Sequence, residues 1–448
     1  MICVSPRPTS CRSAHLLWQV IALSGIAGCA APDGEKSMPI SPSVALLDTA
    51  VAEPMPAPGR VVAWEEPHAI TEGSERPGQH HATVARQANG EVAIAWDEFG
   101  DVKSSWFGVF DAQGQPLIEP LWLRECDGPG PCRFDVEAHD DGYWLCGSDS
   151  VGVWLMALDL GGAVVVEPYL LESAETGVSV EAPDIALRRD GGLLVVWVRR
   201  DLSSRLGGEY ATVWVDASGV PEGEPETLGV SPDGLSVPDA VGNAYGGASV
   251  AWFEHAKNAT DGKLHLTEWF WPGVYGGDAI VAQGAAMMEP RVMLDATEDG
   301  TLVAAWRATL DEGVSSVRVR SRSADLVWGP VVELQAGESL DKPMVAASDD
   351  TAFVAWDDVG GKDQPDRPLI WWQMVDLTTM TAIDVPVPLA DGEASQTRSA
   401  MDVLLEDGMP AVSVVWSAKR FPGVPRQVKH MTGRVQRLGE PSSDVGER

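Results

Sequence analysis

The chain has 448 residues, of which 44% are hydrophobic and 22% are charged, and its formal net charge at pH 7 is −34. That charge repels the phosphate backbone of nucleic acids, which argues against nucleic-acid binding, and it also repels anionic lipid headgroups. Association with a membrane would therefore need a dedicated anchor.

The first 28 residues have the layout of an export signal. Arg7 and Arg12 supply positive charge, and no acidic residue precedes position 33. The apolar segment Leu16–Ser24 is too short to span a bilayer as a helix. It is followed at 26–29 by Ile-Ala-Gly-Cys, which resembles the bacterial lipobox. The resemblance implies cleavage after residue 28 and lipidation of Cys29.

An ordinary signal peptide, cut near Ala30-Ala31, is the alternative, and both interpretations export the chain. Ala30, rather than an aspartate, follows the cysteine. By resemblance to the enterobacterial sorting rule, this favours the outer membrane. Because two or three acyl chains hold a protein on a membrane durably, we expect the protein to be lipid-anchored in the cell envelope, on the periplasmic or the surface face.

The segment 29–58 is poor in aromatic residues and contains Pro54-Met55-Pro56-Ala57-Pro58, which predicts a flexible tether behind the lipidated cysteine. We expect the folded domain to cover residues 59–437 and a polar tail to cover residues 438–448.

Three cysteines belong to the predicted domain. Cys126 and Cys132 enclose the turn-forming residues Asp-Gly-Pro-Gly-Pro, and we expect Cys146 to lie on the second strand of the following hairpin, opposite about Asp135 or Val136. This arrangement favours a Cys126–Cys132 disulfide, which an oxidising compartment allows. Three unpaired thiols are the alternative.

From about residue 59, one short phrase recurs: an apolar strand that ends in Trp after a tight polar turn. Asn89-Gly90 precedes Val92–Trp96, for example, and such a dipeptide is a strong hairpin signal because both turn positions favour positive φ. The phrase ends at Trp96, Trp197, Trp252, Trp306, Trp356 and Trp416. A seventh copy has Cys146 in the place of Trp. We refer to these seven positions as the anchors.

The anchors define units of roughly 50 to 60 residues, a period typical of repeat architectures. In the first unit, four strands are expected at His81–Gln87, Val92–Trp96, Ser105–Phe110 and Ile118–Leu123. Four antiparallel strands form one blade of a β-propeller. The sequence therefore predicts an all-β, seven-bladed β-propeller of four-stranded antiparallel blades.

The last unit supplies three strands but no clear fourth strand. Arg60–Trp64 precedes the first unit without a hairpin partner of its own. Because a loose blade would expose strand edges, we expect this N-terminal strand to pair into the last blade and close the ring. The anchor tryptophans are expected in the blade cores, where both faces of a strand are covered, rather than in a sugar site.

Charged residues follow most anchors, on the connections that share one face of a propeller. The candidate ligand-binding residues are Asp97, Glu98, Arg199, Arg200, Glu254, His255, Arg307, Asp357, Asp358 and Arg420. The inner strands begin on the same face with His80, His81, Arg133, Asp184, Asp239, Arg291, Lys342 and Arg398. Such a ring of mixed charge suits a polar ligand, and a merely solvated rim is the alternative.

By their place after the second strand, Arg199, Arg307 and Arg420 resemble the arginine triad of sialidases, which clasps a carboxylate. The repeat of that family, Ser-x-Asp-x-Gly-x-Thr-Trp, is absent, and the turns at 111–114 and 216–219 share only an Asp and a Gly with it. The histidines are not at metal-ligand spacing, and no Walker motif occurs, so we expect no metal and no cofactor.

Residues 59–437 resemble bacterial lipoproteins whose body is a repeat propeller, most of them of unassigned function. The combination of anchor and propeller is also similar to the outer-membrane assembly scaffold lipoproteins. The anchor, the long polar loops and the lack of a catalytic constellation favour a non-catalytic binding or scaffold protein that uses its charged face to bind an envelope protein, a peptide or a glycan. The alternatives are a sialidase-like glycan-processing hydrolase and a structural envelope protein without a small ligand.

Overall fold

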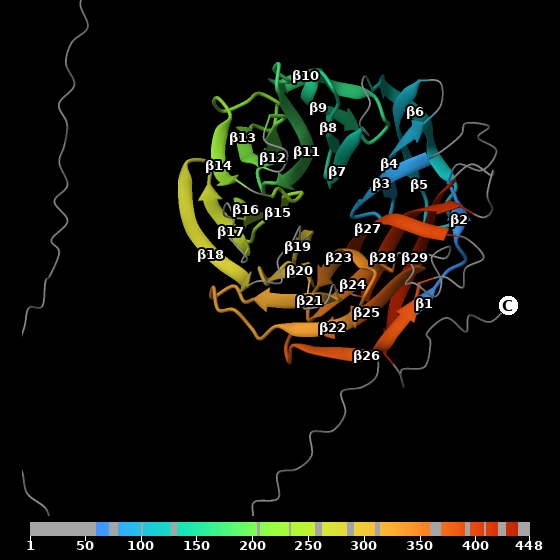
Figure 1. Cartoon of the computed structure of the whole chain (residues 1–448). Coiled ribbons are helices and arrows are strands. Elements are labelled where there is room, and N and C mark those ends of the chain that lie inside the picture. The colour runs from blue at the N-terminus through green and yellow to red at the C-terminus, as the bar shows by residue number, and fades with distance from the viewer. Residues whose placement is uncertain are drawn as a thin grey trace, which may run out of the picture. The chain divides into compact units, whose positions relative to one another are not determined.

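The computed structural model describes residues 60–70, 79–99, 102–126, 132–203, 207–232, 234–255, 262–284, 291–309, 314–358, 369–389, 395–406, 409–419 and 427–437. These residues form seven antiparallel sheets that succeed one another around a ring (Figure 1). The predicted all-β, seven-bladed propeller is confirmed. The predicted signal peptide, Cys29, the predicted tether, Arg420 and the predicted polar tail lie outside the described residues.

The first four blades take their strands consecutively from the chain. Blade 1 consists of β3 (Gln79–Arg86), β4 (Val92–Phe99), β5 (Lys103–Phe110) and β6 (Pro116–Glu125). Blade 2 consists of β7 (Arg133–His139), β8 (Gly142–Ser148), β9 (Gly152–Asp159) and β10 (Val164–Ser173). Blade 3 consists of β11 (Val178–Leu187), β12 (Leu193–Asp201), β13 (Gly208–Val215) and β14 (Glu226–Ser231). Blade 4 consists of β15 (Asp239–Gly242), β16 (Ala248–His255), β17 (Gly262–Trp271) and β18 (Val274–Gly284).

The remaining blades follow the same plan, apart from the last one. Blade 5 consists of β19 (Val292–Ala296), β20 (Leu302–Thr309), β21 (Ser315–Arg322) and β22 (Val332–Gly337). Blade 6 consists of β23 (Leu340–Ser348), β24 (Thr351–Asp358), β25 (Leu369–Asp376) and β26 (Thr381–Pro388). Blade 7 consists of β27 (Ser395–Glu406), β28 (Met409–Lys419), β29 (Gln427–Arg437) and β1 (Arg60–Trp64), and the short β2 (His68–Ala69) also pairs with β29.

The N-terminal strand closes the ring, as the sequence predicts. β1 runs antiparallel to β29, with Arg60 opposite Arg437 and Trp64 opposite Gly433. The guanidinium of Arg60 also donates two hydrogen bonds of 2.6 Å to the carboxylate of Asp350 in blade 6. The two ends of the described chain therefore share one sheet, and that sheet is tied to its neighbour.

The anchors are buried in the blade cores. The six tryptophans are between 0 and 7% exposed, and Cys146 is fully buried. In blade 2, a different tryptophan is buried on the face of the sheet opposite Cys146. Trp154 on β9 lies over Gly147, where a Cβ atom would stand 2.2 Å from the indole ring.

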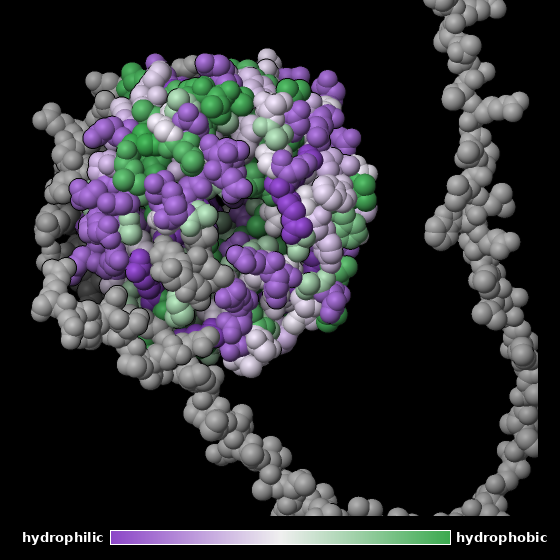
Figure 2. Space-filling view, turned by 180° about the vertical axis from the view of Figure 1, so that it is seen from behind, coloured by the Kyte–Doolittle hydropathy of each residue, from purple (hydrophilic) through white to green (hydrophobic). Residues whose placement is uncertain are grey.

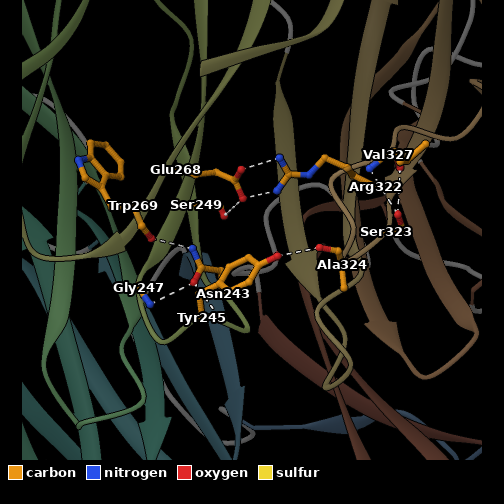
Figure 3. Close-up of polar contacts among 10 residues, drawn as sticks. All are labelled: Asn243, Tyr245, Gly247, Ser249, Glu268, Trp269, Arg322, Ser323, Ala324 and Val327. Atoms are coloured by element: carbon orange, nitrogen blue, oxygen red, sulfur yellow. Dashed lines mark hydrogen bonds and ion pairs between the residues drawn. The ribbon is translucent and has the colours of Figure 1, made fainter. Parts of the chain in front are cut away.

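Polar side chains also join neighbouring blades. The buried ion pair of Glu268 on β17 with Arg322 on β21 joins blade 4 to blade 5, and Ser249 donates a hydrogen bond of 3.1 Å to the same carboxylate (Figure 3). The hydroxyl of Tyr245 donates to the carbonyl of Ala324 at 2.7 Å. The face of the propeller seen in Figure 2 is hollowed near its centre, and hydrophilic side chains border the hollow.

Replacement of a buried anchor should weaken the fold. Trp306→Ala removes an indole that is 1% exposed, and we expect a loss of about 3–5 kcal/mol in the free energy of unfolding, measured by chemical denaturation. Trp122→Ala is the matched control, because this indole on the outer strand β6 is 57% exposed. Equal losses in the two variants would contradict the assignment of the anchors to the core.

Candidate functional site

The inner strands present every second side chain to the central channel of the propeller. On β7, Phe134 and Val136 pack into the core, whereas Arg133, Asp135 and Glu137 alternate with them and are half-buried. This alternation is the two-residue period of a strand. The channel-facing residues thus lie in tiers, with Arg133 at the strand start and the carboxyl groups further along.

Two adjoining cavities of about 460 and 320 Å³ open where the inner strands begin, and we call them together the mouth pocket. They share Arg133, Ala182, Val237 and Arg291 as lining residues. The basic residues of the mouth pocket are His81, Arg133, Arg200, Arg291, Arg307 and Lys342. These six side chains come from five different blades, so only the closed ring brings them together.

Carboxylates that line the mouth pocket or lie behind it hold several of these basic side chains. Arg200 donates a hydrogen bond of 2.5 Å to Glu181, and Arg307 donates one of 3.0 Å to Asp341. Behind the rim, the fully buried Asp97 lies 3.8 Å from Nδ1 of His81, and the fully buried Asp357 lies 3.7 Å from Nζ of Lys342. The last two carboxylates are candidates from the sequence, and the structure places them in a supporting position.

Backbone conformation is unusual at the same place in three blades. His81, Ala182 and Lys342 have φ values of 50°, 53° and 46°, in the left-handed region that costs a non-glycine residue about 1–3 kcal/mol. Each lies at a register shift between the first two strands of its blade, and such bulges redirect side chains. All three residues line the mouth pocket. Backbone strain of this kind is found most often at functional sites.

Aspartates on the inner strands clasp consecutive blades together. Each accepts a hydrogen bond from a backbone N–H of the following blade. The pairs are Ile185 to Asp135 (3.2 Å), Ala240 to Asp184 (2.6 Å), Leu294 to Asp239 (2.5 Å), Ala347 to Asp295 (2.6 Å) and Arg86 to Asp402 (2.6 Å). Thr83 of blade 1 also donates to Asp135, at 3.1 Å. Because an unpaired backbone N–H inside a protein is costly, these clasps stabilise the ring.

The clasps place several carboxyl groups around one narrow channel. Burial raises the pKa of Asp135 and of Asp402 to about 6, and that of Asp295 to about 7. Burial, together with the neighbouring carboxylates, raises the pKa of Glu137 and of Asp184 well above the usual range. The group therefore retains protons that separate carboxyls would release in water.

Sequence reasoning noted Asp184 and Asp239 as inner-strand residues but missed the repeated role. The available signal was a single aspartate preceding an apolar residue in the first strand of a unit. It occurs as Asp135-Val136, Asp184-Ile185, Asp239-Ala240, Asp295-Ala296 and Asp402-Val403.

The other candidates lie away from the mouth pocket. Arg199 bonds at 2.8 Å to Glu172 on β10, because it points to the opposite side of β12 from Arg200. Glu254 pairs with Lys263 and His265 at 3.2 and 2.9 Å.

The remaining contacts of the candidates are also local. Glu98 accepts a hydrogen bond of 3.4 Å from the indole of Trp96, and Asp358 accepts one of 2.5 Å from Ser339. The backbone N–H of His255 donates to Ser231 at 2.9 Å. Of the ten candidate ligand-binding residues, Arg200 and Arg307 line the mouth pocket.

The cysteines lie apart from this chemistry. Cys126 and Cys132 form a disulfide at the end of blade 1. Cys146 is buried and is not part of a disulfide, and it lies opposite Asp135 on the neighbouring strand. Within the described ranges, no three His, Cys, Asp or Glu side chains are grouped as a metal site would require. The same part of the chain has no helix with the length and hydropathy to cross a bilayer.

Comparison with solved structures returns remote similarities. A protein of unknown function from Dyadobacter fermentans is 13% identical, with a TM-score of 0.49 over 84% of this chain and 99% of that chain. A neuraminidase-like protein of A/flat-faced bat/Peru is 9% identical, with a TM-score of 0.44 over 86% of this chain and 95% of the other. The endosialidase of phage phi92 is 10% identical, with a TM-score of 0.42 over 86% and 71%.

No protein-family profile and no curated protein sequence matches the chain. The strand pairing defines it as a seven-bladed β-propeller, with remote structural similarity to sialidase-like proteins. This similarity concerns the fold and transfers no activity to the chain.

The channel carboxyls predict that the fold loses stability as the pH rises. Between about pH 4 and pH 7, Asp135, Asp295 and Asp402 keep protons in the folded state that they release on unfolding. Their contribution to stability is therefore complete below the unfolded pKa and is lost as the pH rises through the folded pKa. We expect Tm to be higher at pH 5 than at pH 8 by at least about 3 °C.

Asp184→Asn separates this effect from general charge repulsion. The amide can accept the bond from Ala240 and donate to Asp135, but it cannot ionise. Compared with the unaltered chain, we expect the variant to show a smaller difference in Tm between pH 5 and pH 8 and a higher Tm at pH 8. Asp325→Asn, an exposed turn position, is the control. An unchanged pH dependence in Asp184→Asn would contradict the role of the channel carboxyls.

Proposed function

We propose that this protein is an exported, lipid-tethered binding protein that holds a small carboxylate-bearing ligand in the mouth pocket. One observation carries the proposal. Six basic side chains from five blades line one pocket, in a chain that has 66 acidic residues against 32 lysines and arginines. The same cavities are also lined by the carboxyl residues Asp135, Glu181, Asp184, Asp239 and Asp341. Basic side chains that converge at the mouth of a pocket attract and orient an anion there.

The contacts of the rim support recognition of a carboxylate in particular. Arginine presents a planar fork of donors that matches the two oxygens of a carboxylate. The ion pairs Arg200–Glu181 and Arg307–Asp341 restrict the rotamers of two such side chains before a ligand arrives. The apolar residues Ala182, Leu235 and Val237 line the same pocket and reduce its hydration.

The test is a calorimetric comparison of matched ligands: glucuronate with glucuronamide, and N-acetyl-alanyl-alanine with its C-terminal amide. We expect at least one carboxylate to bind and its amide to bind about tenfold more weakly or worse, because a bond between charged groups is lost. Arg133→Gln and Arg291→Gln should weaken binding of the carboxylate. Arg318→Gln should not, because Arg318 pairs with Glu333 at the exposed edge of blade 5.

Equal binding of a carboxylate and its amide would contradict the proposal, as would equal losses in Arg291→Gln and Arg318→Gln. A sialidase-like hydrolase is the second candidate, because Asp135 lies beneath the arginines with a pKa of about 6, where a carboxyl group can act as a general acid. Release of a fluorophore from a panel of fluorogenic glycosides, abolished by Asp135→Asn, would favour that candidate.

The tether is a separate part of the proposal. It is supported by the basic start, the apolar segment and the Ile-Ala-Gly-Cys sequence at 26–29. In a bacterial host fed with labelled palmitate, we expect the full chain to carry the label and Cys29→Ser to carry none. Labelled Cys29→Ser protein, or a mature chain that is unlabelled and begins near residue 31, would contradict lipidation at Cys29.

A further inference from the structure

The mouth pocket has groups of opposite charge at two depths. Arg133, Arg291 and Lys342 line it together with Asp135, Asp184 and Asp239. Arg133 and Asp135 stand two residues apart on the same side of β7, so their Cα atoms are about 7 Å apart along the strand. A ligand with a single negative charge would use the rim and would not contact the carboxyl tier.

The carboxyl tier of the mouth pocket has acceptor capacity beyond the clasps. Asp239 lines the pocket, and one of its two oxygens accepts the backbone N–H of Leu294. An ammonium group offers three donors and a positive charge, which this tier lacks.

We propose that the ligand is a short peptide with both termini free, bound with its carboxylate on the rim arginines and its ammonium group on the channel carboxyls. This inference rests on the function proposed above and adds the second charge and the orientation. An extended dipeptide spans about 7 Å, which equals the spacing of the two tiers on β7.

The charges that would meet the ammonium group come from all sides of the channel. The charged and titratable groups that line this part of the pocket are His81, Arg133, Asp135, Asp184, Asp239, Arg291 and Lys342. The carboxyl groups of Glu137, Asp295 and Asp402 interact electrostatically with the tier. The basic members lie at the mouth and the acidic members lie below them. A bound ammonium group would favour the ionised carboxyls, so binding should release protons.

The experiment is titration calorimetry of the full chain with alanyl-alanine, N-acetyl-alanyl-alanine and alanyl-alanine amide. We expect each blocked form to bind about tenfold more weakly than the free dipeptide, or worse. In two buffers of different ionisation enthalpy near pH 6.5, the free dipeptide should release protons. N-acetyl-alanyl-alanine should release none, because it brings no positive charge.

Asp239→Asn is the decisive variant, because Asp239 lines the mouth pocket and the amide oxygen of an asparagine can still accept the N–H of Leu294. We expect this variant to weaken the binding of alanyl-alanine about fivefold or more and to leave the affinity for N-acetyl-alanyl-alanine unchanged. Glu333→Gln, at the exposed edge of blade 5, is the matched control and should change neither affinity. Tm measurements on each variant show that it is folded.

The outcomes separate this inference from the proposed function. If N-acetyl-alanyl-alanine binds as tightly as alanyl-alanine, or if glucuronate binds and neither peptide does, the inference is wrong and the proposed function stands. If no carboxylate of either panel binds, both are wrong. Equal effects of Asp239→Asn on the free and the acetylated peptide would also overturn the inference.

Discussion

A closed ring of sheets requires each blade to pack against both of its neighbours, and the contacts between inner strands meet this requirement nearest the axis. There, Asp184, Asp239 and their counterparts accept a backbone N–H from the next blade, while the anchor indoles fill the cores further out. The clasp joins the blades through a directional hydrogen bond. The indole joins them through the apolar surface area that it buries. Together they position the start of every inner strand, and hence the residues of the mouth pocket.

The clasps also have an electrostatic cost. A ring of blades converges on its axis, so one aspartate from each of several blades places many carboxyl groups in a small volume. Burial and mutual repulsion raise their pKa values, and protons are retained in place of countercharges. The basic residues that would neutralise them lie one tier higher, at the mouth. The same feature that holds the ring together therefore gives the pocket its two charged tiers.

Local strain at the mouth agrees with this view. His81, Ala182 and Lys342 adopt left-handed conformations at equivalent bulges, although a regular strand conformation has a lower free energy. In a regular strand these side chains would follow the usual alternation between the two faces. The bulges redirect them toward the pocket. The buried carboxylates of Asp97 and Asp357 lie close behind His81 and Lys342, and Asp357 balances the positive charge of Lys342.

The amino-acid sequence by itself determined the fold, the blade count and the closure of the ring, because periodic apolar strands and tight turns are local properties. Even the blade without an anchor Trp was recognisable, from the hairpin that precedes Cys146.

The make-up of the site was decided only by tertiary structure. Arg199 and Arg200 are neighbours in sequence, yet the alternation of β12 directs one to Glu172 and the other to the mouth pocket. Arg133 and Arg291 are 158 positions apart in the numbering and line the same cavity. Which side of a strand faces the channel, and which blades meet there, depends on the closed ring. No local pattern contains that information.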